Sequence, residues 1–277
     1  MVFTHLNSYQ WIIGLIVFLY GTAIGSFLNV VIDRHATKES IFRGRSHCDS
    51  CKRTLAWYEL IPLFSFVVQR GRCRSCGTKL SPQYLLIELF TGLVTFSYYF
   101  LYAHADVLTF VQNIHVLLFI YALIVATLVD LKEGIIPDGV HIFAVVLFVA
   151  HAVVVMLYQL LHGTCCSSIT NELISHLVGA IIAGAFFGTL ILITKGRGMG
   201  GGDFKLSMSM GLILSPLQLF LSLYLSFVIG GVVALSLVAA KRKKIGQTVP
   251  FGPFMALGAL VVLFFGPQLI RLYLTVT

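Results

Sequence analysis

A run of glycines that ends in a carboxylate is the first place in the sequence where chemistry is expected. The run reads Gly196-Arg-Gly-Met-Gly-Gly-Gly-Asp203-Phe-Lys205 and lies between two long apolar segments. Each interior glycine costs a helix about 1 kcal/mol relative to alanine, so the run predicts a non-helical turn with a bare backbone that another chain can approach closely. Asp203 then stands where a new helix is expected to begin.

A second carboxylate, Asp130, ends an apolar segment that continues as Leu-Lys132. A helix C-terminus carries partial negative charge, so an aspartate there is electrostatically disfavoured, and a simple solvated loop residue is the alternative. Asp138 differs because it follows Pro137 and opens the next apolar segment, where capping of free backbone amides is the ordinary explanation. We therefore leave Asp138 out of the chemistry.

Asp130 and Asp203 are both expected at one boundary of a membrane, on different helices that a bundle can bring face to face. Ionisable groups at such depth are expensive, about 2.5–3.5 kcal/mol near the bilayer centre, and are commonly functional. Two adjacent carboxylates do not readily both ionise, so one keeps a proton while the other activates water. This arrangement indicates aspartic-protease chemistry, with helix capping as the alternative for Asp203.

The same stretch also matches a dinucleotide-binding pattern, Gly-x-Gly-x-x-Gly over residues 196–201. That pattern binds a nucleotide only when it follows a β-strand in a βαβ unit. Here it follows an apolar segment long enough to span a membrane, so we reject a dinucleotide site.

Two Cys-x-x-Cys pairs predict a metal site between residues 33 and 84. They are Cys48-Asp-Ser-Cys51 and Cys73-Arg-Ser-Cys76. Four thiolates suit tetrahedral zinc and leave no open position, which favours a structural ion over a catalytic one. A thioredoxin-like redox pair is the rival, but no βαβ pattern surrounds either pair. Cys165 and Cys166 are adjacent, and their role stays open between a bridge to another protein and two plain thiols.

The composition identifies an integral membrane protein, with 58% hydrophobic and only 11% charged residues. We predict an all-α polytopic protein, a bundle of about eight transmembrane helices with a small cytoplasmic zinc-stapled domain. The expected organisation is a first span in 1–32, a zinc-binding domain in 33–84 and a membrane-embedded aspartic peptidase domain in 85–277. Small residues, Gly21 and Gly25, predict close packing of the first span against another helix. The expected spans are 11–32, 85–103, 114–130, 138–160, 173–194, a short one near 204–216, 217–240 and 251–270.

The net charge of +8 is concentrated on one face of this bundle. With the N-terminus outside, loops 33–84, 131–137, 195–203 and 241–250 share a face that collects all Lys and Arg except Arg271. Basic juxtamembrane loops are the usual mark of the cytoplasmic side, where they meet anionic lipids, so a nucleic-acid partner is excluded. The competing functions are an ion-coupled transporter and a zinc-stapled scaffold without catalysis. The first is disfavoured because the aspartates lie at span ends and only one helix break is evident.

Taken together, these residues closely resemble the type IV prepilin leader peptidases, bifunctional GxGD membrane aspartic proteases of type IV pilus and type II secretion systems. The resemblance runs over nearly the whole chain and rests on the paired cysteines and four further motifs. These are Gly25-Ser-Phe-Leu-Asn29-Val, Asp130-Leu-Lys with Ile-Pro-Asp138, Gly200-Gly-Gly202-Asp203-Phe-Lys205-Leu, and Pro250-Phe-Gly-Pro253. Where the family often has an aromatic residue between the two motif glycines, this chain has Gly201.

The resemblance implies that Asp130 and Asp203 are the catalytic pair and that Gly200, Gly202 and Lys205 lie at the approach of the substrate. The substrate would be a prepilin or pseudopilin, cut after the glycine that ends its basic leader, at the cytoplasmic side of a bacterial inner membrane. Many members then methylate the new N-terminus with S-adenosylmethionine, and Gly71 and Glu88 match positions linked to that activity. The residues do not predict the oligomeric state.

Overall fold

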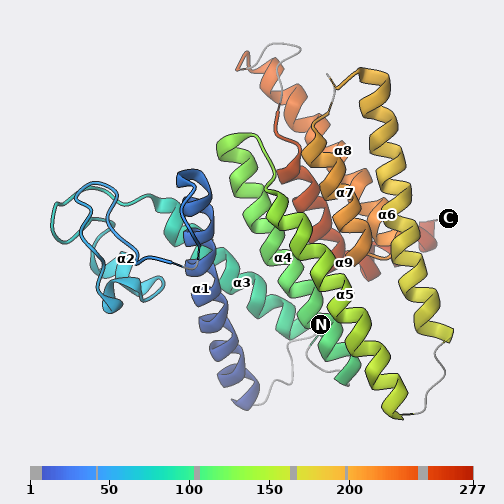
Figure 1. The fold of residues 1–277 in the computed structure, drawn as a ribbon, viewed down its shortest axis with the longest axis horizontal. Coiled ribbons are helices and arrows are strands. Elements are labelled where there is room, and N and C mark those ends of the chain that lie inside the picture. The colour runs from blue at the N-terminus through green and yellow to red at the C-terminus, as the bar shows by residue number, and fades with distance from the viewer. Residues whose placement is uncertain are drawn as a thin grey trace. The chain divides into compact units, whose positions relative to one another are not determined.

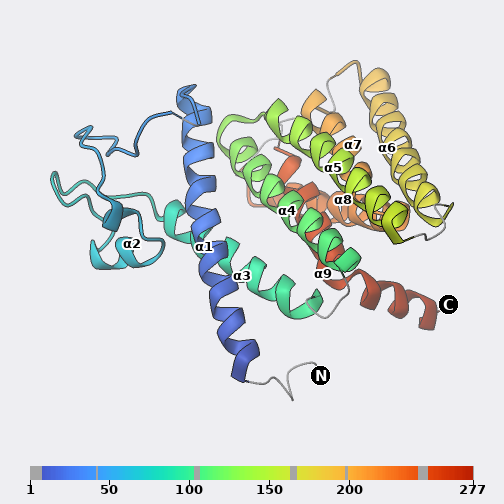
Figure 2. The ribbon, with the colours of Figure 1, turned by 60° about the horizontal axis from the view of Figure 1, so that its bottom comes forward.

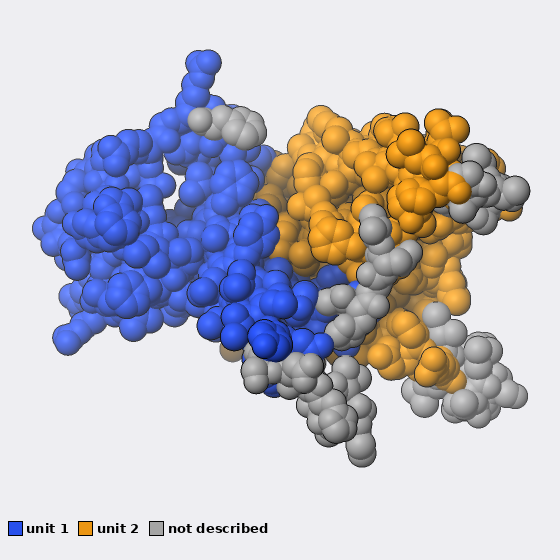
Figure 3. Space-filling model, turned by 90° about the horizontal axis from the view of Figure 1, so that it is seen from below, with its two compact units in different colours: residues 1–105 blue, residues 106–277 orange. Residues whose placement is uncertain are grey.

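The computed structural model describes residues 8–41, 43–102, 107–162, 167–196, 199–242 and 249–276. These residues are almost entirely helical, and among them two isolated β-bridges occur but no strand. The chain divides into two compact units, residues 1–105 and 106–277, which Figure 3 distinguishes by colour. The predicted all-α class is confirmed.

In the first unit, helices α1 (Ser8–Thr37) and α3 (Pro82–Tyr102) lie side by side (Figures 1 and 2). Glycines set the closeness of this contact, as the small-residue pattern predicts. A Cβ atom added at Gly25 would lie 2.8 Å from the Cα atom of Glu88, and one added at Gly21 would lie 2.7 Å from the Cβ of Thr95. Any larger residue would therefore force the two helices apart.

The chain between α1 and α3 forms a small domain with little regular structure. It contains a 3₁₀ helix, η1 (Trp57–Leu60), and a short helix, α2 (Phe64–Val68). The two β-bridges join His47 to Thr54 and Arg72 to Lys79, so each closes a turn around one pair of cysteines. A domain with so little secondary structure needs a covalent or metal staple to hold it.

The second unit is a bundle of six helices in the described residues. The pairs α4–α5, α6–α7, α8–α9, α4–α9 and α5–α7 pack against one another. Phe119, Ile120, Ala126 and Val129 of α4 are fully buried, so this helix lies at the core of the unit. The helices are α4 (Val107–Glu133), α5 (Asp138–His162), α6 (Ser167–Thr194), α7 (Gly201–Ile213), α8 (Pro216–Ala239) and α9 (Gly252–Val276).

Seven helices of the described chain are long and apolar enough to cross a membrane, judged by length and composition. The remaining predicted span, near 204–216, corresponds to α7, which has only 13 residues and so measures about 20 Å. Helix α7 ends with its C-cap at Leu214. Ser215 then caps α8 and bonds reciprocally with Gln218. Leu206 and Met210 of α7 are fully buried, so this short helix is held inside the bundle.

Candidate functional site

Three helix ends meet around Ile136 in the second unit. Asp130 lies in the last turn of α4, Asp203 in the first turn of α7, and Gly252 begins α9. A Cβ atom added at Gly202 would lie 3.3 Å from the Cβ of Ile136, and one added at Gly252 would lie 3.2 Å from its Cδ1. The Ile136 side chain therefore fills the space between the starts of α7 and α9.

The two carboxylates predicted to act together lie within electrostatic range of one another. Asp130 is only 5% exposed, and Asp203 is half-buried. Asp203 lies on α7, outside the seven candidate spans. Burial, and secondarily the negative charge of Asp130, raise the pKa of Asp203 to about 6. Such a pair loses its second proton closer to neutral pH than an isolated aspartate does, which suits acid–base hydrolysis.

The capping alternative for Asp203 is partly right. The N-cap of α7 is Gly200, whose backbone is extended (φ −79°, ψ 151°), and Asp203 is the third residue of the helix. Its carboxylate accepts a hydrogen bond from the Gly200 backbone N–H, which is one half of a capping box. This bond fixes the side chain toward the helix start. A cap and an acid are therefore compatible roles for the same carboxylate.

The motif glycines differ in how tightly they are enclosed. Gly202 packs against Ile136 and leaves no room for a side chain without movement, whereas a Cβ atom on Gly201 would meet nothing within 4 Å. The open space at Gly201 can hold a larger residue. Lys205, predicted at the substrate approach, forms an ion pair with Asp138 of α5, with 2.6 Å between Nζ and Oδ1. Both side chains are largely exposed, so this pair adds little stability.

Gly252 is a residue of this site to which the sequence assigned no role. Its backbone N–H donates a hydrogen bond of 3.0 Å to Oδ2 of Asp130. A Cβ atom at this position would lie 2.6 Å from the same oxygen, so only glycine allows the contact. Because Gly252 begins a 25-residue helix, the positive end of the α9 dipole also faces the carboxylate. The motif Pro250-Phe-Gly-Pro253, singled out from the sequence, contains Gly252. The motif did not reveal that Gly252 bonds to Asp130.

The four predicted metal ligands come together in the first unit. The Sγ atoms of Cys48, Cys51, Cys73 and Cys76 all lie within 4.8 Å of one another. Both turns have the same construction: the first cysteine donates its N–H to the carbonyl five residues on and accepts from the N–H four residues on. Left-handed backbone at Lys52 (φ 56°) and Gly77 (φ 69°) closes the two turns. Four sulfur donors at this spacing fit a tetrahedral thiophilic ion.

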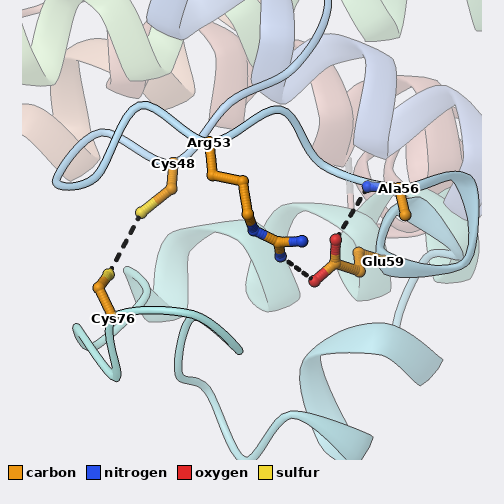
Figure 4. A network of polar contacts seen from close by, with 5 residues as sticks. All are labelled: Cys48, Arg53, Ala56, Glu59 and Cys76. Atoms are coloured by element: carbon orange, nitrogen blue, oxygen red, sulfur yellow. Dashed lines mark hydrogen bonds and ion pairs between the residues drawn. The ribbon is translucent and has the colours of Figure 1, made fainter.

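An ion pair ties the first cysteine turn to η1 (Figure 4). The guanidinium of Arg53 lies 2.6 Å from Oε1 of Glu59, and Oε2 of Glu59 accepts a 2.8 Å hydrogen bond from the Ala56 N–H. Glu59 is 6% exposed, so the pair is shielded from solvent on the carboxylate side. The bond from Ala56, and then the contact with Arg53, lower the pKa of Glu59. Cys165 and Cys166, whose role the sequence left open, lie outside the described residues.

A cavity of about 220 Å³ lies wholly within the first unit, between α1, α3 and the small domain. Asn29 of α1 is 4% exposed in its wall and donates from Nδ2 to the Tyr84 carbonyl at 3.2 Å. Its Oδ1 has no hydrogen-bond partner within the described part of the chain. Glu88 of α3, also in the wall, is 7% exposed and accepts a 2.7 Å hydrogen bond from the Leu63 N–H. The cavity thus offers two buried acceptors.

Gly71, paired with Glu88 in the sequence prediction, does not line this cavity. It has a left-handed backbone (φ 63°) and follows α2, where its N–H bonds to the Phe66 carbonyl. A Cβ atom there would lie 3.1 Å from the Phe66 ring. The local geometry alone therefore requires glycine.

Comparisons with known proteins give a family match in each of the two units. Residues 19–102 match the bacterial Peptidase A24 N-terminal domain, and residues 117–235 match the Type IV leader peptidase family. A "Prepilin leader peptidase/N-methyltransferase" of Bacillus subtilis (strain 168) is 30% identical over 94% of this chain and 97% of its own length. Proteins of the same name from Aeromonas hydrophila and Legionella pneumophila are 29% and 28% identical, each over 96% of its own length. No solved structure gives a significant match. The chain belongs to the Type IV leader peptidase family.

Proposed function

We propose that this protein cleaves the leader of type IV prepilins or pseudopilins and methylates the new N-terminus. The observation that carries the peptidase half is the pair formed by Asp130 and Asp203 at the ends of two helices. The family and the names of its relatives support both activities. Transport is not favoured, and a scaffold role leaves the buried pair unexplained.

The environments of the two carboxylates suggest which one carries the proton. Asp203 has a pKa raised to about 6, so it holds a proton more readily than an ordinary aspartate. Burial of Asp130 opposes its ionisation, but it accepts from the Gly252 N–H and faces the positive end of α9, and both contacts favour the ionised form. Asp130 is therefore assigned as the general base and Asp203 as the general acid.

Hydrolysis then follows the usual acid–base course. Ionised Asp130 takes a proton from water as the water oxygen attacks the carbonyl carbon of the leader glycine. Protonated Asp203 donates its proton to the carbonyl oxygen, and the tetrahedral intermediate collapses. The leaving amine takes the proton held by Asp130 as the C–N bond breaks, and the hydroxyl formed from the carbonyl oxygen returns its proton to Asp203. The side-chain-free backbone of residues 200–202 gives an extended substrate room beside Asp203.

The membrane placement follows from the positions of these groups on the helices. Asp130 near the end of α4 and Asp203 near the start of α7 share a face with the basic loops, which is assigned to the cytoplasmic side of a bacterial inner membrane. The N-terminus is then outside. Basic loops bind anionic lipid head groups and hold this face at the surface.

Zinc is assigned to Cys48, Cys51, Cys73 and Cys76, whose sulfur atoms cluster as such an ion requires. With all four positions supplied by the chain, the ion has a structural role. It holds the small domain that forms one wall of the cavity in the first unit.

The methyl donor, S-adenosylmethionine, is assigned to that cavity. It supplies a methyl group on a positively charged sulfur, to be transferred to the new α-amine of the pilin. Asn29 Oδ1 would accept a hydrogen bond from an amine or hydroxyl of the donor. The carboxylate of Glu88 would attract its positive charge and would accept the proton that the amine loses on methylation.

One assay tests both halves of this proposal. Purified protein is incubated with a prepilin and methyl-labelled S-adenosylmethionine, and leader release and label transfer are measured together. Asp130→Asn and Asp203→Asn should each lower cleavage by at least about 1,000-fold, because neither amide can transfer the proton. Cleavage by either variant at the parental rate would disprove the assignment of the pair.

The methylation half is tested with a substrate that has already lost its leader. Asn29→Leu should reduce label transfer to this substrate by at least about tenfold, since Oδ1 no longer accepts from the donor. Leader release from intact prepilin by the same variant reports whether the protein is folded. Label transfer at the parental rate would place the methyl donor elsewhere.

A further inference from the structure

A second polar cavity, independent of the proposed function, lies among α4, α5, α6 and α7 of the second unit. Its volume is about 430 Å³, and its wall includes His115, His151, Glu172 and His176. His115 precedes Asp130 on α4 by fifteen residues, which corresponds to about 22 Å. The cavity therefore lies toward the opposite end of α4 from the carboxylate pair. Ionisable side chains inside a membrane bundle are costly and commonly mark a functional site.

Two of the histidines are held in the same way. His115 is 6% exposed, and its ring bonds to the Leu147 carbonyl. His176 is 8% exposed, and its Nδ1 bonds to the Leu214 carbonyl at 2.9 Å. Each ring is thus oriented by a backbone carbonyl through one nitrogen, which leaves the other nitrogen available. Histidines that bind metals are usually oriented in this manner, with the non-ligating N–H donated to a carbonyl or carboxylate.

The available nitrogen of His115 is unsatisfied. Its Nδ1 is buried and has no hydrogen-bond partner among the described residues. A buried polar atom without a partner costs about 1–3 kcal/mol, so a structural role for this histidine leaves a cost unexplained. A ligand in the cavity would remove that cost.

The neighbouring groups complete a donor set from three helices. The rings of His115 and His151 lie 4.5 Å apart between centroids, at 30° to one another. His176 interacts electrostatically with both rings, and Glu172 does so with His151. Three imidazoles with one carboxylate suit a divalent transition metal of borderline hardness, of which zinc is the commonest.

We propose that α4, α5 and α6 bind a divalent transition-metal ion through His115, His151 and His176, with Glu172 as the fourth ligand. Among groups of three or more potential metal ligands in the described part of the chain, only the four cysteines already have their donor atoms within 4.8 Å of one another. The histidine site therefore requires a side-chain movement before it can bind an ion. The histidine site closes when the part-exposed ring of His151 rotates away from its tilted contact with the His115 ring. The bound ion would then join three helices that the sequence connects only by loops.

Cobalt(II) distinguishes this site from the cysteine cluster. Full-length protein with its cysteine site filled by zinc is titrated with Co²⁺, and its absorption spectrum is recorded. One further equivalent should bind, with visible bands of nitrogen and oxygen ligation and without the near-ultraviolet sulfur-to-cobalt band. Absence of the extra equivalent, or an increase only in the sulfur band, would overturn the proposal.

Three variants show whether the histidines are responsible. His176→Ala should weaken Co²⁺ binding at this site by more than about 100-fold, and Glu172→Gln by at least about tenfold. Glu172 is exposed, so its substitution does not disturb the core and answers the question if the histidine variant fails to fold. His162→Ala is the matched control, because His162 is an exposed histidine of α5 outside this cavity. Equal loss in the His162 variant, or undiminished binding in the Glu172 variant, would refute the site.

Discussion

The cysteine cluster and the carboxylate pair are built on opposite principles. Each half of the cluster is a local turn, in which hydrogen bonds within six residues place the sulfur atoms. The carboxylate pair instead depends on the packing of three helices, and the bond between Gly252 and Asp130 joins residues 122 positions apart. A metal can bring two local turns together, whereas the carboxylates need a completed bundle. The two sites should therefore fail in different ways.

Removing two thiols is expected to have the largest effect. Cys48→Ser together with Cys51→Ser leaves two ligands, so the bound zinc should fall by about one ion per chain. Structural zinc contributes about 10–16 kcal/mol in small metal-folded peptides, so residues 46–80 should become accessible to protease. Metal content and limited proteolysis measure this outcome.

The matched control for that experiment removes the same number of thiols elsewhere. Cys165→Ser with Cys166→Ser should keep the full complement of zinc. The helices of the second unit should also resist protease in the Cys48 and Cys51 variant. A zinc content that does not fall by about one ion per chain after loss of Cys48 and Cys51 would contradict the assigned ligands. Collapse of both units would contradict the contrast between local and assembled sites.

A single methyl group should damage the carboxylate site without unfolding the bundle. Gly252→Ala places a Cβ atom only 2.6 Å from Oδ2 of Asp130, so the carboxylate must move. A displacement of about 1 Å commonly costs about 100-fold in rate, and we expect a loss of that size in single-turnover cleavage. Gly139→Ala, where an added Cβ meets nothing within 4 Å, should cleave normally. Equal rates for the two variants would show that α9 does not position Asp130.

The smallest expected effect is a gain in stability. The pKa of Asp203 is about 6 in the folded protein against an ordinary value of 3.8, so between these values the folded state binds more protons than the unfolded state. Stability should therefore fall as pH rises through this window and stay lower above it. Asp203→Asn removes that loss, so the variant should melt a few degrees higher than the parent above pH 6 and equally below about pH 4.

Thermal unfolding in detergent at several pH values measures the difference. The parent protein at each pH is its own reference, and Asp138→Asn, which changes an exposed carboxylate of an ion pair, is the control. A Tm of the Asp203 variant at or below that of the parent at pH 7.5 would mean that ionised Asp203 does not destabilise the folded protein. Activity and stability would then not oppose one another at this site.

Helix boundaries were accessible from the sequence because hydrophobic length directly reports a membrane span. The expected spans 138–160 and 217–240 correspond to α5 (Asp138–His162) and α8 (Pro216–Ala239). The cysteine cluster was equally accessible, since its ligands are paired within each turn. The prediction of eight crossings was least certain at α7. The low helix propensity of the glycine run does not reveal that the helix begins within it, at Gly201.

Rotational orientation of the helices was not accessible. Hydropathy does not tell which side of α4 faces α5, so the meeting of His115 with His151 and His176 could not be foreseen. Gly252 stood in a motif already singled out, yet its partner Asp130 belongs to another helix. The sequence likewise does not show that Asn29 Nδ2 donates to the Tyr84 carbonyl, and so it does not predict that Oδ1 is left for a ligand. Such contacts are properties of packing and not of any single segment.

The hydrogen bond from Gly252 to Asp130 has a consequence for biosynthesis. Asp130 enters the membrane with α4, but the amide that orients it belongs to α9, which is inserted later. A ribosome-bound chain that has not yet released α9 would hold both aspartates without an aligned base. Proteolytic capacity would thus arise only once α9 has been inserted, and loss of this helix would yield an inserted but inert protein.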